Sequence, residues 1–407
     1  MPTPFLFHNP DYSIVLLDLP SSIQHAQHSQ SRLASSPVIE IPYPSNEPGE
    51  QKRGSLLAAL SIDDQAFHSC LQHCICEAIA TIQKDYIRGQ NGNWHVPRHE
   101  VSRPNEWPRE LPATQARASS GICHGLKKST HGPFQPSVVP MILSTTEWRT
   151  VFPSLQAVSG IVIHNPPLPW PRTSLMSTDE GEFVIPPEAT FIHATLESGL
   201  QSFIHGSQTL FAPHVPLFDL ILMDPPWTNR SARRSSHYLT AQDQPVDPFD
   251  QAVHIVQCHL QSPGLVAVWI TNKSSIRHTV LDRFRTINMA LWEEWVWVKV
   301  TSQGVPVTQL DGFWRRPYEL CLIFRRASQP PGMTTVQPRR RVIAAVPDLH
   351  SRKPSLKPLL EQLLPDNYQA LELFARSLTA GWWSWGDEVL KFQSMDNWVQ
   401  DDVSRLE

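Results

Sequence analysis

Glycine is scarce in this sequence, with 17 residues in 407, and no GxGxxG loop, P-loop or nucleophile elbow is present. The sequence therefore gives no sign of these common nucleotide-binding and hydrolase motifs. No apolar run reaches the ~18 residues that a membrane span requires, so we expect no membrane segment. Charged residues make up 18% of the chain and the formal net charge is −4. A nucleic-acid site would consequently be a local basic patch on a neutral-to-acidic body.

Cysteine pairs are missing as well. Six cysteines occur, and none belongs to a CxxC motif, so we expect no disulfide framework. The first residues show no basic stretch followed by a cleavage site, and we expect a reducing compartment, the nucleus or the cytoplasm. Cys70 and Cys74 share the apolar face of a predicted helix, where thiols behave as small hydrophobes. No metal site is predicted.

Proline is abundant instead, with 38 residues, which favours long irregular stretches. We divide the chain into an N-terminal region, 1–137, and a larger second domain at 138–400. The N-terminal region is expected to be partly disordered, above all over the Ser/Pro/Gln-rich residues 20–54. Its ordered parts are an edge strand at 13–17 and a helix near 63–87, where apolar residues recur at helical spacing.

The second region alternates strands with helices. Apolar or alternating runs predict strands at 217–223, 264–270, 294–300, 318–324 and 370–375. The third and fourth of these are expected to be antiparallel neighbours. Helices are expected at 249–261, 274–291 and 355–364, and a Pro-rich loop at 327–341. The alternation predicts an α/β fold with a mostly parallel, doubly wound sheet, whose ligands bind at the carboxyl ends of the strands.

The motif Asp224-Pro225-Pro226-Trp227 follows the most apolar of these strands. The prolines fix φ and remove two backbone donors, which is expected to leave the Asp224 and Pro225 carbonyls free beside a carboxylate. Such acceptors suit the protons of an exocyclic amine and stabilise the charge that develops when the amine is alkylated. Trp227 offers a flat wall on which a base can stack. The alternative interpretation is a Pro-Pro turn at a strand end with a packing tryptophan.

Several segments around this motif resemble one family, the MT-A70 adenine methyltransferases, and within it the methyltransferase-like-four branch. The blocks are WTNRSARRS (227–235), VWITNK (268–273), EWVWVKV (294–300), RRPYE (315–319), LHSRKP (349–354) and LELFARSLTAGWWSWGDEVLKFQ (371–393). The resemblance covers about 185–395. It implies a Rossmann-like methyltransferase fold, S-adenosylmethionine as cofactor, and Asp224 to Trp227 as the catalytic centre.

The same resemblance implies a cofactor site. Lys353 matches a lysine that contacts the cofactor, and Glu372 and Arg376 match positions that shape the adenosine-ribose pocket. Asp387 and Glu388 match an Asn-Glu/Gln pair at the ribose hydroxyls. The alternative is a set of ordinary surface salt bridges.

Two positions depart from the family pattern. Asp387 replaces the usual Asn, and a carboxylate can still accept from both ribose hydroxyls. Thr195 replaces an Asp that touches the amino group of the cofactor, so we expect weaker cofactor binding.

A basic loop follows the motif directly. Residues 228–241 contain no acidic side chain, and Asn229, Arg230, Arg233 and Arg234 are predicted to bind nucleic acid by holding the phosphates beside the target base. Further arginines are expected to extend this patch, namely Arg315, Arg316, Arg325, Arg326 and Arg339–Arg341. The alternative is a solvated charged loop.

These observations predict an enzyme that methylates the 6-amino group of adenine in nucleic acid. The substrate is expected to be small nuclear RNA, at a 2′-O-methyladenosine, or DNA, with the adenine flipped out or single-stranded. Two alternatives stay open: a catalytically inactive nucleic-acid-binding subunit of a methyltransferase complex, and a small-molecule N-methyltransferase. The sequence leaves the oligomeric state open.

Overall fold

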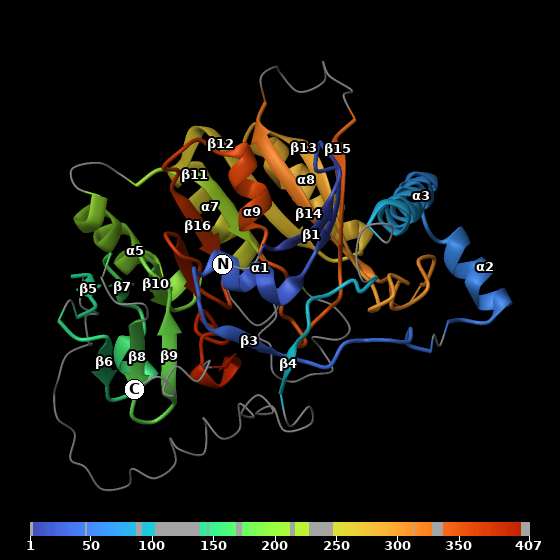
Figure 1. The fold of residues 1–407 in the computed structure, drawn as a ribbon. Helices are drawn as coiled ribbons and strands as arrows, with labels where there is room; N and C mark the ends of the chain where they lie inside the picture. The colour runs from blue at the N-terminus through green and yellow to red at the C-terminus, as the bar shows by residue number, and fades with distance from the viewer. Residues whose placement is uncertain are drawn as a thin grey trace, which may run out of the picture.

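A large mixed sheet with helices on both faces dominates the computed structural model (Figure 1). The structure describes residues 3–44, 47–86, 92–101, 139–144, 146–167, 173–211, 216–227, 247–313, 315–327 and 337–399. Within these ranges, twelve strands form the sheet in the order β1-β2-β15-β13-β14-β12-β11-β16-β17-β10-β7-β5. Most neighbours are parallel. The α/β, Rossmann-like architecture is therefore confirmed.

Five strands at the centre of the sheet overlap the predicted ones: β11 (Phe218–Met223), β12 (Leu260–Ile270), β13 (Met289–Lys299), β14 (Tyr318–Arg326) and β16 (Ala370–Leu373). Two further central strands, β15 (Arg339–Ala345) and β17 (Trp383–Gly386), were not predicted. β13 and β14 pair antiparallel, as predicted. The helix expected at 274–291 ends earlier, as α8 (Ser274–Thr286). The reason is Asn288, whose φ of 59° places it in the left-handed region and ends the helix just before β13.

Helices cover both faces of the sheet, because successive side chains of a central strand point to opposite faces and both faces are apolar. Ile221 and Met223 pack on one side with α3 (Ile62–Asp85), α5 (Leu196–Phe211), α7 (Pro248–His259) and α8. Leu220 and Leu222 pack on the other with α1 (Leu19–Ala26) and α9 (Lys357–Leu360). No helix among the described residues is long and apolar enough to cross a membrane. Two buried layers therefore enclose the central strands, as a doubly wound sheet requires.

The N-terminal region is part of the same sheet. β2 (Ile14–Leu17) runs parallel to β15, and β1 (Phe5–His8) forms the outer edge beside β2. The disorder expected over 20–54 is wrong for most of these residues, which include α1, β3 (Arg32–Ser35) and α2 (Glu50–Ala58). The helix α3 agrees with the one predicted near 63–87. Its buried residues Leu71, Ile75 and Ile82 pack against the sheet.

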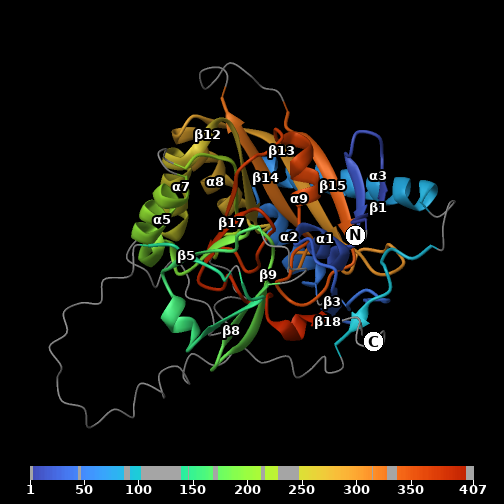
Figure 2. The same ribbon diagram turned by 60° about the vertical axis from the view of Figure 1, so that its left-hand side comes forward.

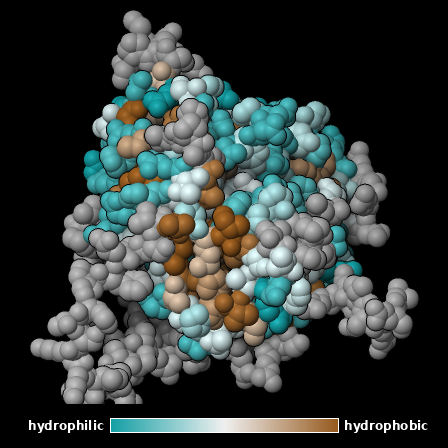
Figure 3. All heavy atoms as spheres, turned by 90° about the vertical axis from the view of Figure 1, so that its left-hand side faces the viewer, coloured by the Kyte–Doolittle hydropathy of each residue, from teal (hydrophilic) through white to brown (hydrophobic). Residues whose placement is uncertain are grey.

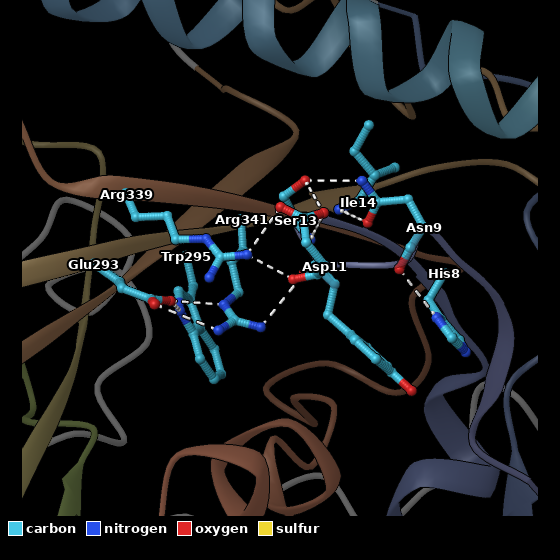
Figure 4. Close-up of polar contacts among 10 residues, drawn as sticks. His8, Asn9, Asp11, Ser13, Ile14, Glu293, Trp295, Arg339 and Arg341 are labelled. Carbon is cyan, nitrogen blue, oxygen red and sulfur yellow. Dashed lines mark hydrogen bonds and ion pairs between the residues drawn. The ribbon is translucent and has the colours of Figure 1, made fainter.

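The arginine run 339–341 lies in strand β15, not in the predicted loop. Arg341 Nε donates to Glu293 Oε2 at 2.6 Å, and Arg339 lies 2.9 Å from Asp11 (Figure 4). Arg340 pairs with Glu294, whose side chain is fully buried. The expectation that this run extends a nucleic-acid patch is therefore wrong, because adjacent glutamates of β13 take up two of its charges.

Two smaller sheets flank the central one (Figure 2). The first is formed by β6 (Arg149–Phe152), β8 (Thr173–Ser177) and β9 (Gly181–Ile185), and the second by β3, β4 (His99–Glu100) and β18 (Trp398–Val399). Remaining strands of the central sheet are β5 (Met141–Ile142), β7 (Val162–His164) and β10 (Thr190–His193).

An apolar area lies on the face that carries β5 and β6 (Figure 3). Both strands are at the edge of their sheet, and Ile142 and Val151 are 48% and 60% exposed. No lining residue of the pocket described below comes from these strands. The apolar area is thus separate from that pocket.

Candidate active site

Four neighbouring parallel strands, β11, β16, β17 and β10, end at one edge of the sheet. The carboxyl ends of parallel strands meet at a common edge, where open α/β sheets bind their ligands. The residues that directly follow these strands are Asp224, Phe374, Asp387 and Ala194. The fold therefore brings the Asp-Pro-Pro-Trp motif and the predicted cofactor residues to one edge.

The Asp-Pro-Pro-Trp motif forms a tight turn. The Asp224 N–H donates to the Leu373 carbonyl at 3.4 Å, which ties the turn to β16. The Trp227 N–H donates to the Pro225 carbonyl at 2.8 Å. The expectation that this carbonyl is free is wrong, because the turn lets the next N–H reach back to it. A carbonyl oxygen has two acceptor positions, so one remains.

The indole of Trp227 is fixed from two sides. Its Nε1 donates to the Trp269 carbonyl of β12 at 2.8 Å. Its ring packs against Phe249 of α7, with centroids 5.0 Å apart and planes tilted by 56°. These contacts hold the ring in place beside Asp224, and its predicted stacking role stays a prediction.

An ionic network surrounds the Asp224 carboxylate. Nζ of Lys353 lies 2.5 Å from Oδ2 of Asp224 and 3.5 Å from Oε2 of Glu319. Nζ of Lys299 lies 2.5 Å from Oε1 of Glu319. Burial favours the neutral form of Glu319, but the two ammonium groups outweigh it and lower its pKa to about 2. Burial also opposes the charge of Lys353, yet the carboxylates of Asp224 and Glu319 raise its pKa. Lys353 therefore stays charged beside Asp224.

The sequence prediction missed Glu319. β14 runs antiparallel to β12, so it begins at the edge where β12 ends. Glu319 is the second residue of β14 and consequently lies at the site. The sequence contained the information needed to find Glu319. A strand antiparallel to its neighbours starts at the edge where they end, and the block RRPYE places a carboxylate at the start of this strand.

Glu372 lies with this network and not with the ribose residues. It is opposite Leu222 in the pairing of β11 with β16, two positions before Asp224. Its side chain is half-buried. Burial, with a further contribution from the Asp224 charge, raises the pKa of Glu372 to about 8, and Lys353 only partly opposes this. The carboxyl group is thus mostly protonated at neutral pH.

One pocket contains most of these groups. Its lining includes Asp224, Lys353, Glu372, Phe374 and Arg376, together with Ile23, Ala26 and Gln27 from the α1 segment. The N-terminal region therefore supplies one wall of the pocket that Asp224 lines.

The loop that carries Lys353 is anchored by its neighbour. The buried guanidinium of Arg352 donates to Asp348 Oδ2 and the Ala34 carbonyl, both at 2.8 Å, and to Asn397 Oδ1 at 2.7 Å. Asp348 in turn accepts from the Ser36 N–H at 2.7 Å. Segments far apart in the chain thus fix the position of Lys353.

Arg376, Asp387 and Glu388 form a second group. Nε of Arg376 lies 3.1 Å from Oε2 of Glu388. Burial, followed by the charge of Glu388, raises the pKa of Asp387. His193 is beside it, with a buried Nδ1 that has no hydrogen-bond partner among the described residues. Arg376 therefore links Glu388 to the neighbourhood of Lys353, and the role of Asp387 and Glu388 at a ribose stays a prediction.

Thr195 caps α5. Its Oγ1 accepts from the Ser198 N–H at 3.1 Å, and its carbonyl accepts from Trp385 Nε1 at 3.2 Å. The hydroxyl is thus used by the helix end. An Asp at this position would cap the helix equally well.

The predicted nucleic-acid residues Asn229, Arg230, Arg233 and Arg234 lie outside the described residues. Of the arginines expected to extend the patch, Arg316 is taken up by His68, with Nη1 2.6 Å from Nδ1. Burial, then the charge of Arg316, lowers the pKa of His68 to about 4. In the described ranges, no three His, Cys, Asp or Glu side chains are placed to hold a metal ion.

Comparison with known proteins shows which family the chain belongs to. The MT-A70 family model matches residues 218–388. N6-methyladenosine RNA methyltransferase MTA1 of Cryphonectria parasitica is 32% identical, over 97% of this chain and 94% of that protein. Human N(6)-adenine-specific methyltransferase METTL4 is 32% identical over 86% of this chain and 71% of its own length. The DNA N6-methyl methyltransferase of Caenorhabditis elegans is 29% identical over 63% of this chain and 68% of its own length.

A doubly wound sheet with the Asp-Pro-Pro-Trp turn at its carboxyl edge defines a Rossmann-like methyltransferase. More specifically, the chain belongs to the MT-A70 family, and METTL4 is among its relatives. The resemblance inferred from the motifs is therefore confirmed.

Proposed function

We propose that this protein transfers the methyl group of S-adenosylmethionine to the 6-amino group of adenine in nucleic acid. The observation that carries the proposal is the position of Asp224. Its carboxylate lies at the end of β11, in a pocket with Lys353 and Glu372. The relatives reported above are named as adenine methyltransferases of RNA or DNA.

The residues present fit this cofactor. A sulfonium is a cation, and the carboxyl groups of Asp224 and Glu372 line the pocket. A ribose offers two hydroxyls, and Asp387 with Glu388 offers acceptors for them, beside the unpartnered Nδ1 of His193. Lys353, Glu372, Arg376, Asp387 and Glu388 would hold the cofactor, which supplies an electrophilic methyl group when bound.

The side chains of the turn act on the acceptor. The amino group of adenine is a poor nucleophile because its lone pair is delocalised into the ring. The Asp224 carboxylate accepts one of its protons in a hydrogen bond, and the remaining acceptor position of the Pro225 carbonyl is available for the other. Both stabilise the positive charge that grows on the nitrogen. Trp227, held by Trp269 and Phe249, stacks on the base.

The nucleic acid must present its adenine singly, because the nitrogen is inaccessible within a duplex. We propose small nuclear RNA at a 2′-O-methyladenosine, or DNA, as substrate, and the nucleus as the site of action. The basic residues 230–234 would hold the flanking phosphates.

The deciding experiment gives the purified protein labelled S-adenosylmethionine and matched RNA and DNA oligonucleotides, with and without 2′-O-methyladenosine. We expect N6-methyladenine in one of these polymers, identified by mass spectrometry of the nucleosides. Cofactor binding without transfer to any polymer would favour the inactive-subunit alternative. Methylation of free adenosine alone would favour the small-molecule alternative. A parallel assay with Asp387→Ala should show a large loss of cofactor affinity, whereas Asp387→Asn, the residue usual in the family, should retain it.

A further inference from the structure

The Asp224 network contains a carboxyl group without a counter-charge. Lys353 and Lys299 are matched by Asp224 and Glu319, and Arg376 is matched by Glu388. Glu372 makes no hydrogen bond or ion pair with any residue that the structure describes. If Glu372 were ionised, its negative charge would therefore have no positive partner among the described residues, unless a cation entered the pocket.

Three further cationic side chains line the same pocket, and each has its own acidic partner: Arg352 with Asp348, Lys357 with Glu361, and Arg376 with Glu388. Asp224 faces it from the end of β11 and Lys353 from the loop before α9. Ser384 is opposite it in β17, and the Oγ of this serine is buried without a partner. The α1 segment contributes only neutral side chains, such as Gln27, to the pocket. The burial and the Asp224 charge explain the raised pKa of about 8.

We propose that Glu372 senses the charge of the bound ligand: it releases its proton to solvent when a sulfonium cation enters the pocket and takes a proton back when the ligand is the neutral thioether. This proposal rests on the proposed function, because it presumes that the pocket takes S-adenosylmethionine. The exchange involves one O–H bond and no other covalent change. A cation favours the ionised carboxyl, whereas the demethylated product offers no such compensation. The site thereby distinguishes cofactor from product by charge.

The test uses titration calorimetry on the full chain, with S-adenosylmethionine and S-adenosylhomocysteine as ligands, in pairs of buffers that differ in ionisation enthalpy. Near pH 7, the sulfonium ligand should release more protons than the thioether, by a difference approaching one. Its affinity relative to the thioether should improve by up to about tenfold per pH unit between pH 6 and 8, and level off above the pKa of Glu372. The relative affinity rises with pH because the sulfonium ligand prefers the ionised carboxyl, which is the minor form below the pKa of Glu372.

Variants separate Glu372 from other titrating groups. In Glu372→Gln the difference in proton release should shrink to what the amino groups of the two ligands contribute by themselves. Glu372→Asp keeps a titratable group and should keep a pH-dependent difference, which guards against a folding defect in the first variant. Glu50→Gln, at an exposed position in α2, should behave as the wild type.

Equal pH dependence in wild type and Glu372→Gln overturns the proposal, even if both ligands bind. Failure of both ligands to bind the wild type is a different result. It removes the cofactor assignment itself, and this proposal with it.

Discussion

Nζ of Lys353 lies 2.5 Å from Oδ2 of Asp224, although 129 positions separate the two residues. The Asp224 carboxylate is therefore held in an ion pair by a lysine from the loop before α9. Asp224→Asn keeps the shape of the side chain and removes its charge. We expect methyl transfer to fall on the order of 100-fold or more, while cofactor affinity changes little, because Lys353 keeps Glu319 as a partner.

Rates and cofactor affinities of this variant check the prediction. Asp219→Asn is a matched control from the other end of β11, where Asp219 accepts from the Gln369 N–H. It should turn over normally. Transfer by Asp224→Asn close to that of the control would remove Asp224 from the reaction.

Glu319 gives a prediction about acid stability. Its pKa in the folded protein is about 2, below the ordinary value of 4.5. Its contribution to the free energy of unfolding is therefore complete above pH 4.5 and is lost as the pH falls toward 2. Thermal unfolding of wild type and Glu319→Gln should show a constant difference in Tm above pH 5 and a shrinking one below 4.5. A difference that stays constant down to pH 3 would contradict the ionic role of Glu319.

Thr195 tests the departure from the family pattern. Thr195→Asp keeps a side-chain acceptor for the Ser198 N–H, so the helix cap and the Tm should be preserved. If the position faces the cofactor's amino group, affinity for S-adenosylmethionine should rise about tenfold through a charge-assisted hydrogen bond. Thr195→Ala is the control: it should lose about 1 kcal/mol of stability without a gain in affinity. An unchanged affinity in Thr195→Asp would place this side chain away from the cofactor.

Most central strands and the Asp-Pro-Pro-Trp turn could be predicted because their sequence patterns are local. β11 is a continuous apolar run, and the two prolines end it at Asp224. Glu319 needed one further step, the direction of β14 relative to β12. The pairing of Arg340 and Arg341 with Glu294 and Glu293 was beyond reach. From the sequence alone, a run of arginines is expected to be exposed to solvent, and only the neighbouring strand shows which acidic partners it has.

The order of the N-terminal region also could not be predicted from the sequence. Residues 20–54 are rich in serine, proline and glutamine, a composition typical of disordered segments. Ser36 and the Ala34 carbonyl nevertheless bind the buried pair of Asp348 and Arg352, and α1 lines the pocket. Only contacts more than 300 positions apart in the chain reveal this order, and no local pattern records them.

The buried pair predicts a specific energetic signature. Removing one partner leaves an uncompensated buried charge, so Arg352→Leu and Asp348→Leu should each cost on the order of 3 kcal/mol in the free energy of unfolding. The double variant should be less destabilised than the sum of the two, because it leaves no charge unpaired. Denaturant unfolding measures all three. Additive losses would show that the two side chains act independently, against their 2.8 Å contact.

The basic loop after Trp227 gives the last prediction, since it decides whether the substrate is a polymer. Arg230, Arg233 and Arg234 follow the motif within an acid-free run. Each phosphate contact on a single strand contributes roughly 0.7 to the dependence of log affinity on log salt. Replacing all three by Gln should therefore flatten the slope by about 2, while cofactor binding is retained.

A matched control comes from the opposite edge of the sheet. Arg325 and Arg326 are exposed at the carboxyl end of β14. Because β14 begins at the site, these two arginines lie at the opposite edge, and the expectation that they extend the patch is wrong. Their replacement by Gln should leave the slope unchanged, although it also removes two positive charges. Oligonucleotide binding at several salt concentrations compares the three proteins. Equal slopes in all of them would mean that the loop merely keeps the surface solvated. The small-molecule alternative would then regain its weight, because the basic loop is the main sequence feature that calls for a polymeric substrate.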